Sequence, residues 1–487
     1  MVLASITCYP PPPMSNDPTD TGVEPFWTKF DNPEPESCLH LVAAWTLTGP
    51  DRAGHAAPIN ERGWWGRGEP AQGDKTKIRF QAQRPRDITT VPPFEETYIS
   101  RRQLEFEPES EHETRVSNIG RRPLLHNGQV VNQCTVHAGD MLMLQDALLF
   151  LVEMRPSYIP LPSAPEGPKF PYGTADDCGL VGESFPAWQL RDHLSAAANA
   201  DAHVLLLGES GVGKEIAAKT IHARSARHTG PMVARNAATL PAGLIDAELF
   251  GNIKNYPNPG TPERPGLIGA AAGGHLFLDE IGELSEVHQA HLLRVMDSGG
   301  EYQRLGETEP RVSDFRLIAA TNRDPGELKH DFLARFSNVI RISGLNDRRS
   351  DIPLLARELL GRMAAQTPEV ADRFFEGGQA RRVRIEPRLV ELLLRHQYTY
   401  HTRELERVLR VAVETSREGY LAVTEPVLSE LGVIAPSQSV ESGELDARAV
   451  QQALTEQHYN IGKTAERLGI SRHVLYRLMK KFDLSTP

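Results

Sequence analysis

The chain has 487 residues, too many for one hydrophobic core, so about three domains are expected. Its 40% apolar and 24% charged residues are ordinary for soluble globular protein, and no apolar run reaches the roughly eighteen residues of a membrane span. The net charge of −11 excludes an overall attraction to nucleic acid, so DNA binding would need a local basic patch. Four scattered cysteines lack the spacing of a zinc site or a disulfide framework, which favours a reducing cytoplasm.

Changes in composition divide the chain into segments. Residues 1–36 are Pro-rich and lack the basic segment and apolar core of a secretory signal, and we expect a disordered leader. Turn-rich, polar stretches predict linkers at 158–178 and 435–443. The expected folded parts are therefore residues 37–157, 179–345, 346–434 and 444–487.

Residues 37–157 have the pattern of an all-β sandwich. Apolar stretches such as CLHLVAAWTL and MLMLQDALLFLVEM are separated by Gly, Pro and Asn-Gly turns. Arg67, Ser100 and Arg101 between these strands could form an anion pocket, to which Arg121 and Arg122 would add charge. Charged residues on sandwich loops are usually only solvated, and this simpler interpretation stays open.

These loops resemble the peptide-binding loops of a forkhead-associated (FHA) domain, a sandwich that binds phosphothreonine peptides. Gly66-Arg67, Ser100-Arg101 and Asn127-Gly128 are similar to motifs of that fold. Gln103 replaces the histidine that braces its loop, and Arg121-Arg122 replace an upstream Ser/Thr-Asn pair. The resemblance implies a sensor that regulates the rest of the chain and binds a phosphothreonine protein through Arg67, Ser100, Arg101 and Asn127.

Residues 179–345 alternate apolar strands with amphipathic helices, the pattern of a parallel α/β sheet. Between the strand VLLL and a helix start lies GESGVGKE, whose glycines let backbone N–H groups surround phosphates while the lysine reaches the terminal phosphates. Glu215 replaces the Ser or Thr that usually binds Mg²⁺ in such loops. We predict ATP contacts from Gly208, Glu209, Ser210, Gly211, Val212, Gly213, Lys214 and Glu215.

Acidic and polar residues end the next strands of this pattern. Asp279 ends the apolar strand HLFL, where a carboxylate can hold Mg²⁺, and the adjacent Glu280 is placed to polarise an attacking water. The strand FRLIAA ends in Thr321 and Asn322, which could sense the γ-phosphate. Two surface carboxylates are the alternative interpretation, which the buried LFL run disfavours.

Over about residues 180–420 the chain resembles the AAA+ domain of bacterial sigma-54-dependent transcription activators. GESGVGKE, GGHLFLDEIGEL and RLIAATNRD are similar to the Walker A, Walker B and sensor I segments of that family, whose own Walker A variant carries the glutamate. The resemblance implies a P-loop ATPase at 179–345 and, because 346–434 reads as mainly helical, a helical lid. It also implies ATP and Mg²⁺ as cofactors and a homo-oligomeric ring, in this family usually a hexamer.

The resemblance also implies roles for single residues. Asn236 matches the asparagine that restrains the catalytic glutamate, and Arg335 matches an arginine finger that reaches the γ-phosphate of the neighbouring subunit. Lys329 occupies the second finger position, without the planar fork of arginine. Arg403 matches the sensor II arginine, although the preceding Trp-Pro-Gly-Asn reads Tyr398-Thr-Tyr-His401. A structural salt bridge is the alternative for Arg335.

One loop departs from the family. After ELFG, the family carries a Gly-Ala-Phe-Thr-Gly-Ala tip that contacts sigma-54; here Asn252–Pro265 keeps the expected length, but the tip reads Asn255-Tyr-Pro-Asn-Pro-Gly260. Its prolines lack N–H donors and restrict their neighbours, which excludes regular structure. The tip either contacts the same target differently, acts on another target, or has drifted. The candidate contact residues are Asn255, Tyr256, Pro257 and Asn258.

Residues 444–487 have the apolar spacing of two or three short helices, with Gly469 at a tight turn. Ser471 suits the N-cap of the last helix, which exposes a basic face. The segment resembles a Fis-type helix-turn-helix, which implies major-groove binding at a palindromic DNA site; oligomer contacts are the alternative. The candidate DNA-binding residues are Ser471, Arg472, His473, Tyr476, Arg477, Lys480 and Lys481.

These features together predict a cytoplasmic bacterial transcription regulator without membrane association. It would bind upstream DNA and hydrolyse ATP in a ring to remodel an RNA polymerase holoenzyme, and the altered tip leaves open whether that holoenzyme contains sigma-54. The alternative is a DNA-binding scaffold that binds ATP but does not act on sigma-54. A metabolic ATP-dependent enzyme would leave the DNA-binding segment unexplained.

Overall fold

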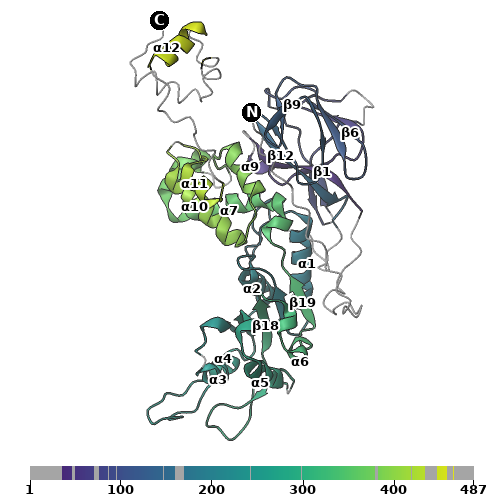
Figure 1. Cartoon of the computed structure of the whole chain (residues 1–487). Helices are drawn as coiled ribbons and strands as arrows, with labels where there is room; N and C mark the ends of the chain where they lie inside the picture. The colour runs from purple at the N-terminus through teal and green to yellow at the C-terminus, as the bar shows by residue number, and fades with distance from the viewer. Residues whose placement is uncertain are drawn as a thin grey trace, which may run out of the picture. The chain divides into compact units, whose positions relative to one another are not determined.

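The structure is a computed structural model that describes residues 36–433, 447–457 and 464, except 47–49, 71–75, 86, 95, 146, 160–168, 242, 298, 379–381 and 418. The chain forms two compact units, Met1–Ala422 and Val423–Pro487 (Figure 1). The expected leader before Glu36 and the expected linker 435–443 lie outside the described residues.

The N-terminal part of the first unit is a β-sandwich. Its two sheets have the strand orders β5-β4-β2-β1-β12-β11-β8-β9 and β10-β7-β6-β3, all pairs being antiparallel, and they share one apolar core. This confirms a strand-rich N-terminal domain, while its FHA character stays a prediction. The strands are β1 (Ser37–Thr46), β2 (Ala56–Pro58), β3 (Gly63–Trp65), β4 (Gln81–Arg84), β5 (Asp87–Thr90), β6 (Leu104–Pro108), β7 (Thr114–Asn118), β8 (Leu124–His126), β9 (Gln129–Val131), β10 (Gln133–Val136), β11 (Met141–Leu144) and β12 (Leu148–Pro156).

Strand β1 is buried on both of its faces. Leu39 and Leu41 point into the sandwich core, because alternate residues of a strand share a face. Val42 and Ala44 lie on the opposite face and are also buried, where helix α9 (Pro387–Arg395) packs against β1 and β12. The Trp45 indole donates to the Ile385 carbonyl at 2.9 Å. The sandwich is therefore packed onto the helical part of the same unit.

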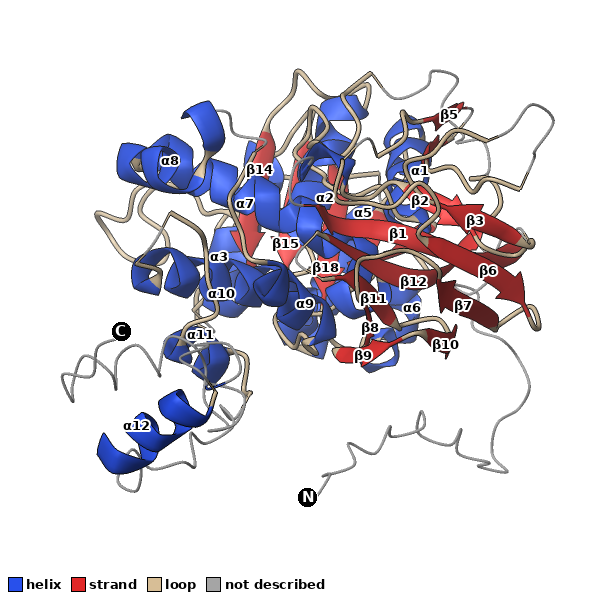
Figure 2. Ribbon diagram, turned by 90° about the horizontal axis from the view of Figure 1, so that it is seen from above, coloured by secondary structure: helices blue, strands red, loops and turns tan. Residues whose placement is uncertain are grey.

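The ATPase-like part has a parallel five-stranded sheet in the order β14-β15-β18-β13-β19 (Figure 2). Leu205 and Leu207 of β13 join a core with α3, α4 and α5, whereas Val204 and Leu206 join a second core with α1 and α2. Helices thus cover both faces, as expected for parallel strands. The strands are β13 (Val204–Leu207), β14 (Met232–Asn236), β15 (His275–Asp279), β18 (Arg316–Thr321) and β19 (Asn338–Arg341). The helices are α1 (Phe185–Asn199), α2 (Lys214–Arg224), α3 (Ile245–Phe250), α4 (Gly266–Ala270), α5 (Glu286–Asp297) and α6 (His330–Leu333).

Three further groups of elements complete the description. A two-stranded hairpin is inserted before β18: β16 (Glu301–Tyr302) and β17 (Arg311–Val312). The helical part, here called the lid, consists of α7 (Ile352–Gln366), α8 (Pro368–Phe374), α9 (Pro387–Arg395) and α10 (His401–Thr415). The second unit contains α11 (Glu425–Glu430) and α12 (Ala447–Glu456). Among the described residues, no helix is long and apolar enough to cross a membrane.

Replacing Phe150 with Ala tests the sandwich core. Phe150 is fully buried, with its ring centroid 5.4 Å from that of Trp65 and 5.6 Å from that of Phe80. The truncation should lower the free energy of unfolding by about 3–5 kcal/mol, because the cavity only partly collapses. Urea unfolding followed by tryptophan fluorescence measures this. The control Val130→Ala, at a 70% exposed position, should change little, and equal midpoints for both variants would contradict the assigned core.

Candidate functional site

The glycine-rich loop 208–214 joins strand β13 to helix α2. Gly211 and Gly213 have φ values of 86° and 108°, in the left-handed region that glycine tolerates. A Cβ atom on Gly211 would lie 2.2 Å from the Tyr400 carbonyl oxygen, so the lid touches this loop where only glycine fits. The Lys214 ammonium donates to the carbonyls of Gly208 at 2.8 Å and Glu209 at 3.1 Å. The sequence pattern and the observed strand–loop–helix therefore agree.

A cavity of about 360 Å³ opens beside this loop. Its volume lies in the range of small-molecule sites. Four parts of the chain meet around it: the segment before α1, the glycine-rich loop, the end of β15, and lid helices α7 and α10. The lining residues include Gly179, Leu180, Val181, Ser210, Gly211, Gly213, Lys214, Glu215, Asp279, Glu280, Arg348, Leu355, Leu359 and Arg403.

Asp279 and Glu280 face this cavity from the carboxyl end of β15. The Glu280 backbone N–H donates to Asp279 Oδ1 at 3.0 Å, and Glu280 has a left-handed φ of 52°. Burial lowers the pKa of Lys214, while the charges of Asp279 and Glu280 raise it. One cation and two carboxylates thus line the same cavity.

The structure places Asn236 next to this pair but gives its side chain another partner. Asn236 pairs with Asp279 across strands β14 and β15. Its Oδ1 accepts a hydrogen bond from Ala238 N at 2.8 Å and caps the following turn. Among the described residues, no hydrogen bond joins the Asn236 and Glu280 side chains. The restraining role of Asn236 stays a prediction.

Thr321 and Asn322 follow β18 at the same edge of the sheet. Thr321 is buried, and its hydroxyl accepts a hydrogen bond from Arg323 N at 3.1 Å. Asn322 is exposed and lines a separate hollow of about 440 Å³ that also touches Gly208 and Glu209. Neither residue lines the 360 Å³ cavity in the described part of the chain.

The two finger candidates lie outside the cavity of their own chain. Arg335 forms an exposed ion pair with Asp297, its Nη2 lying 3.2 Å from Asp297 Oδ2. The Lys329 ammonium lies 3.5 Å from Glu286. Neither side chain is among the described residues that line the nucleotide cavity. The placement leaves both interpretations of Arg335 open, a surface ion pair and an action on a neighbouring subunit.

Arg403 and His401 attach the lid to the glycine-rich loop. Arg403 Nη1 donates to Ser210 Oγ at 3.0 Å. His401 is buried and accepts a hydrogen bond from Leu345 N through Nδ1, which leaves Nε2 to donate to Glu209 at 3.0 Å. Sequence reasoning did not assign His401 a role, although its place in the Tyr398-Thr-Tyr-His401 segment was the available signal. In the structure His401 has a left-handed φ of 46°.

Arg348 is a second residue that the sequence analysis missed. It lines the cavity although only 6% of its surface is exposed, and its Nη2 lies 3.4 Å from the Val212 carbonyl. Burial lowers its pKa, which the nearby Asp351 partly opposes. Nothing local distinguishes Arg348 in the sequence, because its neighbour Arg349 has the same side chain.

The loop between Asn252 and Pro265 has a defined structure. Asn252 is 4% exposed, and its side-chain amide donates to the carbonyls of Ile253 at 3.0 Å, Tyr256 at 3.4 Å and Pro262 at 2.9 Å. Asn255 closes the tip, since its N–H donates to the Thr261 carbonyl and its Oδ1 accepts from Gly260 N. One buried amide therefore organises the base of the loop.

The hairpin β16–β17 supports this loop from outside. Ile253 N donates to the Leu305 carbonyl at 3.1 Å, and Arg304 pairs with Glu263 at 2.5 Å. The Tyr256 ring covers Gly306, where a Cβ atom would meet the ring at 2.6 Å. Tyr256 remains 40% exposed, and Pro257 and Asn258 are exposed as well. The hairpin therefore supports the loop, and the tip residues Tyr256, Pro257 and Asn258 remain exposed.

The sandwich loops bring together some of the predicted phosphopeptide residues. Arg67 N donates to the Ser100 carbonyl at 3.2 Å, and Arg67 Nε donates to the Ile99 carbonyl at 2.8 Å. Arg101 is exposed next to them. Asn127 is held by its own turn, donating to Asp140 and accepting from Met141 N.

Gln103 braces these loops in place of the expected histidine. It is fully buried; its Oε1 accepts from Ser100 N at 3.1 Å and its Nε2 donates to Asn118 Oδ1 at 2.8 Å and to the Arg122 carbonyl at 3.0 Å. An amide can accept and donate at once, so Gln103 connects the loop at Ser100 with Asn118 and the Arg122 backbone.

The arrangement of residues 179–417 is that of an AAA+ nucleotide-binding domain, in which a lid arginine closes a P-loop at the end of a parallel sheet. Family comparison matches residues 180–342 to the sigma-54 interaction domain and residues 443–482 to the Fis family of bacterial regulatory proteins. The chain belongs to the family of bacterial sigma-54-dependent transcription activators with a Fis-type helix-turn-helix, as the following relatives show.

The chain is 34% identical over 322 residues to the transcriptional regulatory protein ZraR of Salmonella typhimurium, which covers 63% of this chain and 70% of that protein. It is 33% identical over 371 residues to the anaerobic nitric oxide reductase transcription regulator NorR of Aeromonas salmonicida, covering 70% and 69%. Among solved structures, NtrX from Brucella abortus in complex with ADP aligns with a TM-score of 0.46 and 27% identity over 62% of this chain and 70% of that chain.

These comparisons confirm the predicted family, the AAA+ domain with its nucleotide site, and the DNA-binding helix-turn-helix. The FHA function, the hexameric ring, Mg²⁺ and the roles of single residues stay predictions. The candidate DNA-binding residues lie outside the described residues: Ser471, Arg472, His473, Tyr476, Arg477, Lys480 and Lys481.

Lys214→Ala should weaken ATP binding by roughly 10- to 100-fold, since a charge-assisted hydrogen bond to a phosphate contributes about 1.5–3 kcal/mol. Fluorescence titration with a labelled ATP analogue measures the dissociation constant. Lys219→Ala is the matched control, because that lysine is 60% exposed on the same helix. Equal affinities for the two variants would contradict the assigned phosphate site.

Asn252→Ala should loosen the loop at its base, because three backbone carbonyls lose their buried donor. We expect trypsin to cut at Lys254 about tenfold faster than in the parent chain, since losing such contacts costs about 1–3 kcal/mol. Asn258→Ala, at the exposed tip, is the control. Unchanged cleavage in Asn252→Ala would show that the amide does not organise the loop.

Proposed function

We propose that the chain hydrolyses ATP in a ring of its own copies and uses the loop tip 255–260 to remodel an RNA polymerase holoenzyme that contains sigma-54. Family membership supports the target. The single observation that carries the proposal is the buried Asn252 amide, which holds the altered tip on a built support. A loop that had drifted would have no reason to retain three hydrogen bonds at its base.

In the proposed hydrolysis, Lys214 and the backbone N–H groups of the glycine-rich loop bind the phosphates, and Glu280 polarises the attacking water. Asp279 fits a Mg²⁺ ion, because its carboxylate ends β15 inside the cavity. Glu215 fits less well, since it pairs with Lys219 at 2.7 Å. Bound Mg²⁺ would neutralise phosphate charge.

A ring supplies what one chain lacks. Arg335 and Lys329 are directed outside the nucleotide cavity of their own chain, so they could reach a nucleotide only in a neighbouring copy. Closed rings of identical subunits bring the same two surfaces together at every interface. We therefore propose that Arg335 acts on the neighbouring nucleotide and that Lys329 contributes charge, in a hexamer as in the family.

The tip offers its target an aromatic ring between exposed polar and proline residues. Tyr256 is 40% exposed, and its ring is fixed against Gly306. An aromatic side chain gives a large contact area at low entropic cost. We propose that Tyr256, with Pro257 and Asn258, contacts the polymerase-bound factor and that Asn255 sets the tip conformation.

Two further modules would control this activity. We propose that Arg67, Ser100 and Arg101 bind a phosphothreonine peptide, supported by their adjacent loops and the brace from Gln103. We also propose that the helix-turn-helix binds a palindromic DNA site, with Arg472, His473 and Arg477 at bases and the two terminal lysines, Lys480 and Lys481, at phosphates.

The proposed target is tested by trapping the transition state. The full chain is incubated with ADP, aluminium fluoride and purified sigma-54, and complexes are separated on a native gel. A nucleotide-dependent complex that is absent with Lys214→Ala and reduced with Tyr256→Ala supports the proposal. No complex from a chain that hydrolyses ATP would direct the search to other polymerase partners.

Glu280→Gln should retain ATP binding but lower the hydrolysis rate by about 100- to 10,000-fold, because the amide cannot polarise water. Phosphate release and labelled-ATP titration measure the two properties separately. If transcription regulation in cells is unchanged in Glu280→Gln, the chain is a DNA-binding scaffold and not a remodelling ATPase.

A further inference from the structure

The Arg84 side chain extends from the sandwich to the segment that precedes helix α1. Arg84 ends strand β4, and its side chain is 8% exposed. Nε and Nη2 bind the two carboxylate oxygens of Glu183 at 3.0 and 2.5 Å, a bidentate pair. Nη1 donates to the Phe170 carbonyl at 2.7 Å, and Nη2 donates to the Pro171 carbonyl at 3.1 Å. Every side of this guanidinium is therefore occupied by the segment 170–184, here called the strap.

Aromatic rings enclose the same guanidinium. Its carbon lies 4.6 Å from the centroid of Phe170, 5.1 Å from that of Tyr172 and 5.6 Å from that of Trp188. A planar cation stacks on such rings and loses little hydration energy there. Arg84 is thus enclosed by the strap and the start of α1, and a second sandwich side chain, Arg155, donates to the Glu183 carbonyl at 2.6 Å.

Glu183 also connects Arg84 to the lid. It is 1% exposed and also accepts hydrogen bonds from Gly173 N at 2.6 Å and Trp188 Nε1 at 3.2 Å. The backbone N–H groups of Glu183 and Ser184 donate to Asp351 Oδ1 at 2.8 and 2.9 Å. Asp351 immediately precedes lid helix α7, so sandwich, strap and lid are joined through one buried carboxylate.

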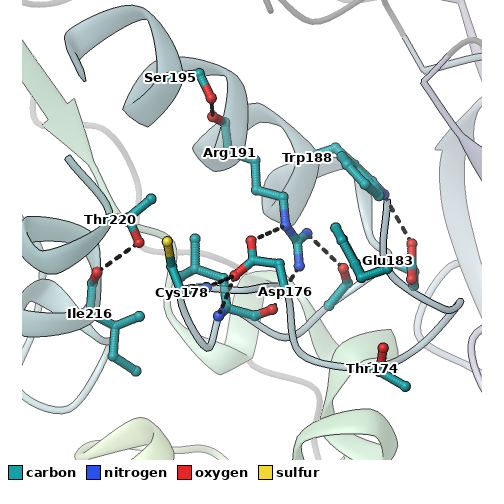
Figure 3. Close-up of polar contacts among 12 residues, drawn as sticks. Thr174, Asp176, Cys178, Glu183, Trp188, Arg191, Ser195, Ile216 and Thr220 are labelled. Atoms are coloured by element: carbon teal, nitrogen blue, oxygen red, sulfur yellow. Dashed lines mark hydrogen bonds and ion pairs between the residues drawn. The ribbon is translucent and has the colours of Figure 1, made fainter. Parts of the chain in front are cut away.

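Hydrogen bonds to Asp176 and from Arg191 also hold the middle of the strap. Asp176 accepts hydrogen bonds from Cys178 N and Leu180 N, both at 3.0 Å, and from Arg191 Nε at 3.2 Å. Figure 3 shows Arg191 of α1 reaching Asp176. Arg191 also donates to the carbonyls of Gly182 at 2.8 Å and Leu180 at 2.9 Å. These bonds hold the strap backbone at Cys178, Leu180 and Gly182.

This held stretch is a wall of the nucleotide cavity. Gly179, Leu180 and Val181 line it from the strap. Arg348 lines it from the turn before Asp351, and Leu355 and Leu359 line it from helix α7, which follows Asp351. Only one residue separates Val181 from Glu183. Breaking the Arg84–Glu183 pair would therefore alter two parts of the cavity wall, the strap and the start of helix α7.

We propose that Arg84 is a positioning residue for the nucleotide: by holding Glu183, this sandwich residue sets the cavity wall formed by the strap and α7. The inference rests on the proposed nucleotide site. Removing Arg84 leaves a buried carboxylate without its counter-charge, which the strap relieves by moving toward water. By linkage, a partner that displaces Arg84 from Glu183 weakens nucleotide binding, and nucleotide weakens that partner by the same factor.

The test compares three variants of the full chain. Arg84→Met keeps the apolar stem and removes the charge, and Arg84→Lys keeps the charge without the planar fork. Arg115→Met is the matched control, because Arg115 is a sandwich arginine whose side chain is 44% exposed and pairs with Glu107 and Glu109. Circular dichroism and size-exclusion chromatography establish that each variant is folded.

Labelled-ADP titration gives the dissociation constant and the number of sites. Arg84→Met should raise the dissociation constant about tenfold and Arg84→Lys by a smaller factor, while Arg115→Met leaves it unchanged. The KM for ATP should rise in the same order with kcat nearly constant. Partial unfolding alone would instead lower the number of sites and kcat without changing the dissociation constant, and that result overturns the proposal.

The outcomes separate this inference from the proposed function. If the parent chain does not bind ADP, both fail. If the parent chain binds ADP and a folded Arg84→Met binds it equally well, only the positioning role fails. If Arg84→Met does not fold, the folded Arg84→Lys decides, and an unchanged dissociation constant in Arg84→Lys overturns the proposal.

Discussion

A carboxylate removed from water is costly unless opposite charge and hydrogen bonds replace its hydration. Glu183 meets this requirement with donors from three directions: Arg84 from the sandwich, Gly173 N in the strap and Trp188 from α1. Its own backbone N–H binds Asp351 at the start of the lid. The sandwich, the strap and the lid therefore have to meet in one arrangement, because separating any of them exposes an unpaired buried group.

The same constraint explains why the sandwich is more than an appended module. Strand β1 is buried on both faces, and the Trp45 indole reaches a lid carbonyl. A sensor that bound its ligand on a flexible tether would have little effect on the ATPase site. Here the contacts run from the sandwich through Glu183 to residues that line the nucleotide cavity. Under the proposed function, a ligand bound to the sandwich would act on the nucleotide cavity through this short route.

The loop tip 255–260 is held by contacts at its base and not by its most exposed side chains. Asn252 and the Arg304–Glu263 pair fix the loop base and hairpin, and they place no demand on the identity of the exposed tip residues. Within the tip, Pro257 and Asn258 are exposed, whereas the Tyr256 ring covers Gly306. The core that α3, α4 and α5 share with strand β15 joins the flanks of the loop to the nucleotide cavity. The residues that support the loop are therefore different from the residues exposed at its tip.

The sequence by itself determined the features that depend on short-range patterns. Periodicity and turn chemistry are local, and they predicted the strand–glycine loop–helix at 204–224, the acidic end of β15 and the strand-rich N-terminal domain. The family was implied by the resemblance of its motifs, and the comparisons confirm it. The assignment of Arg403 as the sensor II arginine was implied by resemblance alone, and the structure places its side chain beside Ser210.

Only the tertiary structure decided the contacts between distant segments. Arg84 and Glu183 lie 99 positions apart, and His401 and Glu209 lie 192 apart, so no local pattern relates them. Residues 170–178 of the strap lie in the stretch 158–178, whose prolines and turns predict a linker, yet hydrogen bonds from Arg84 and Arg191 hold the strap in place. A proline-rich composition reports that a segment lacks regular hydrogen bonding of its own; which buried groups it then satisfies depends on what the fold brings beside it.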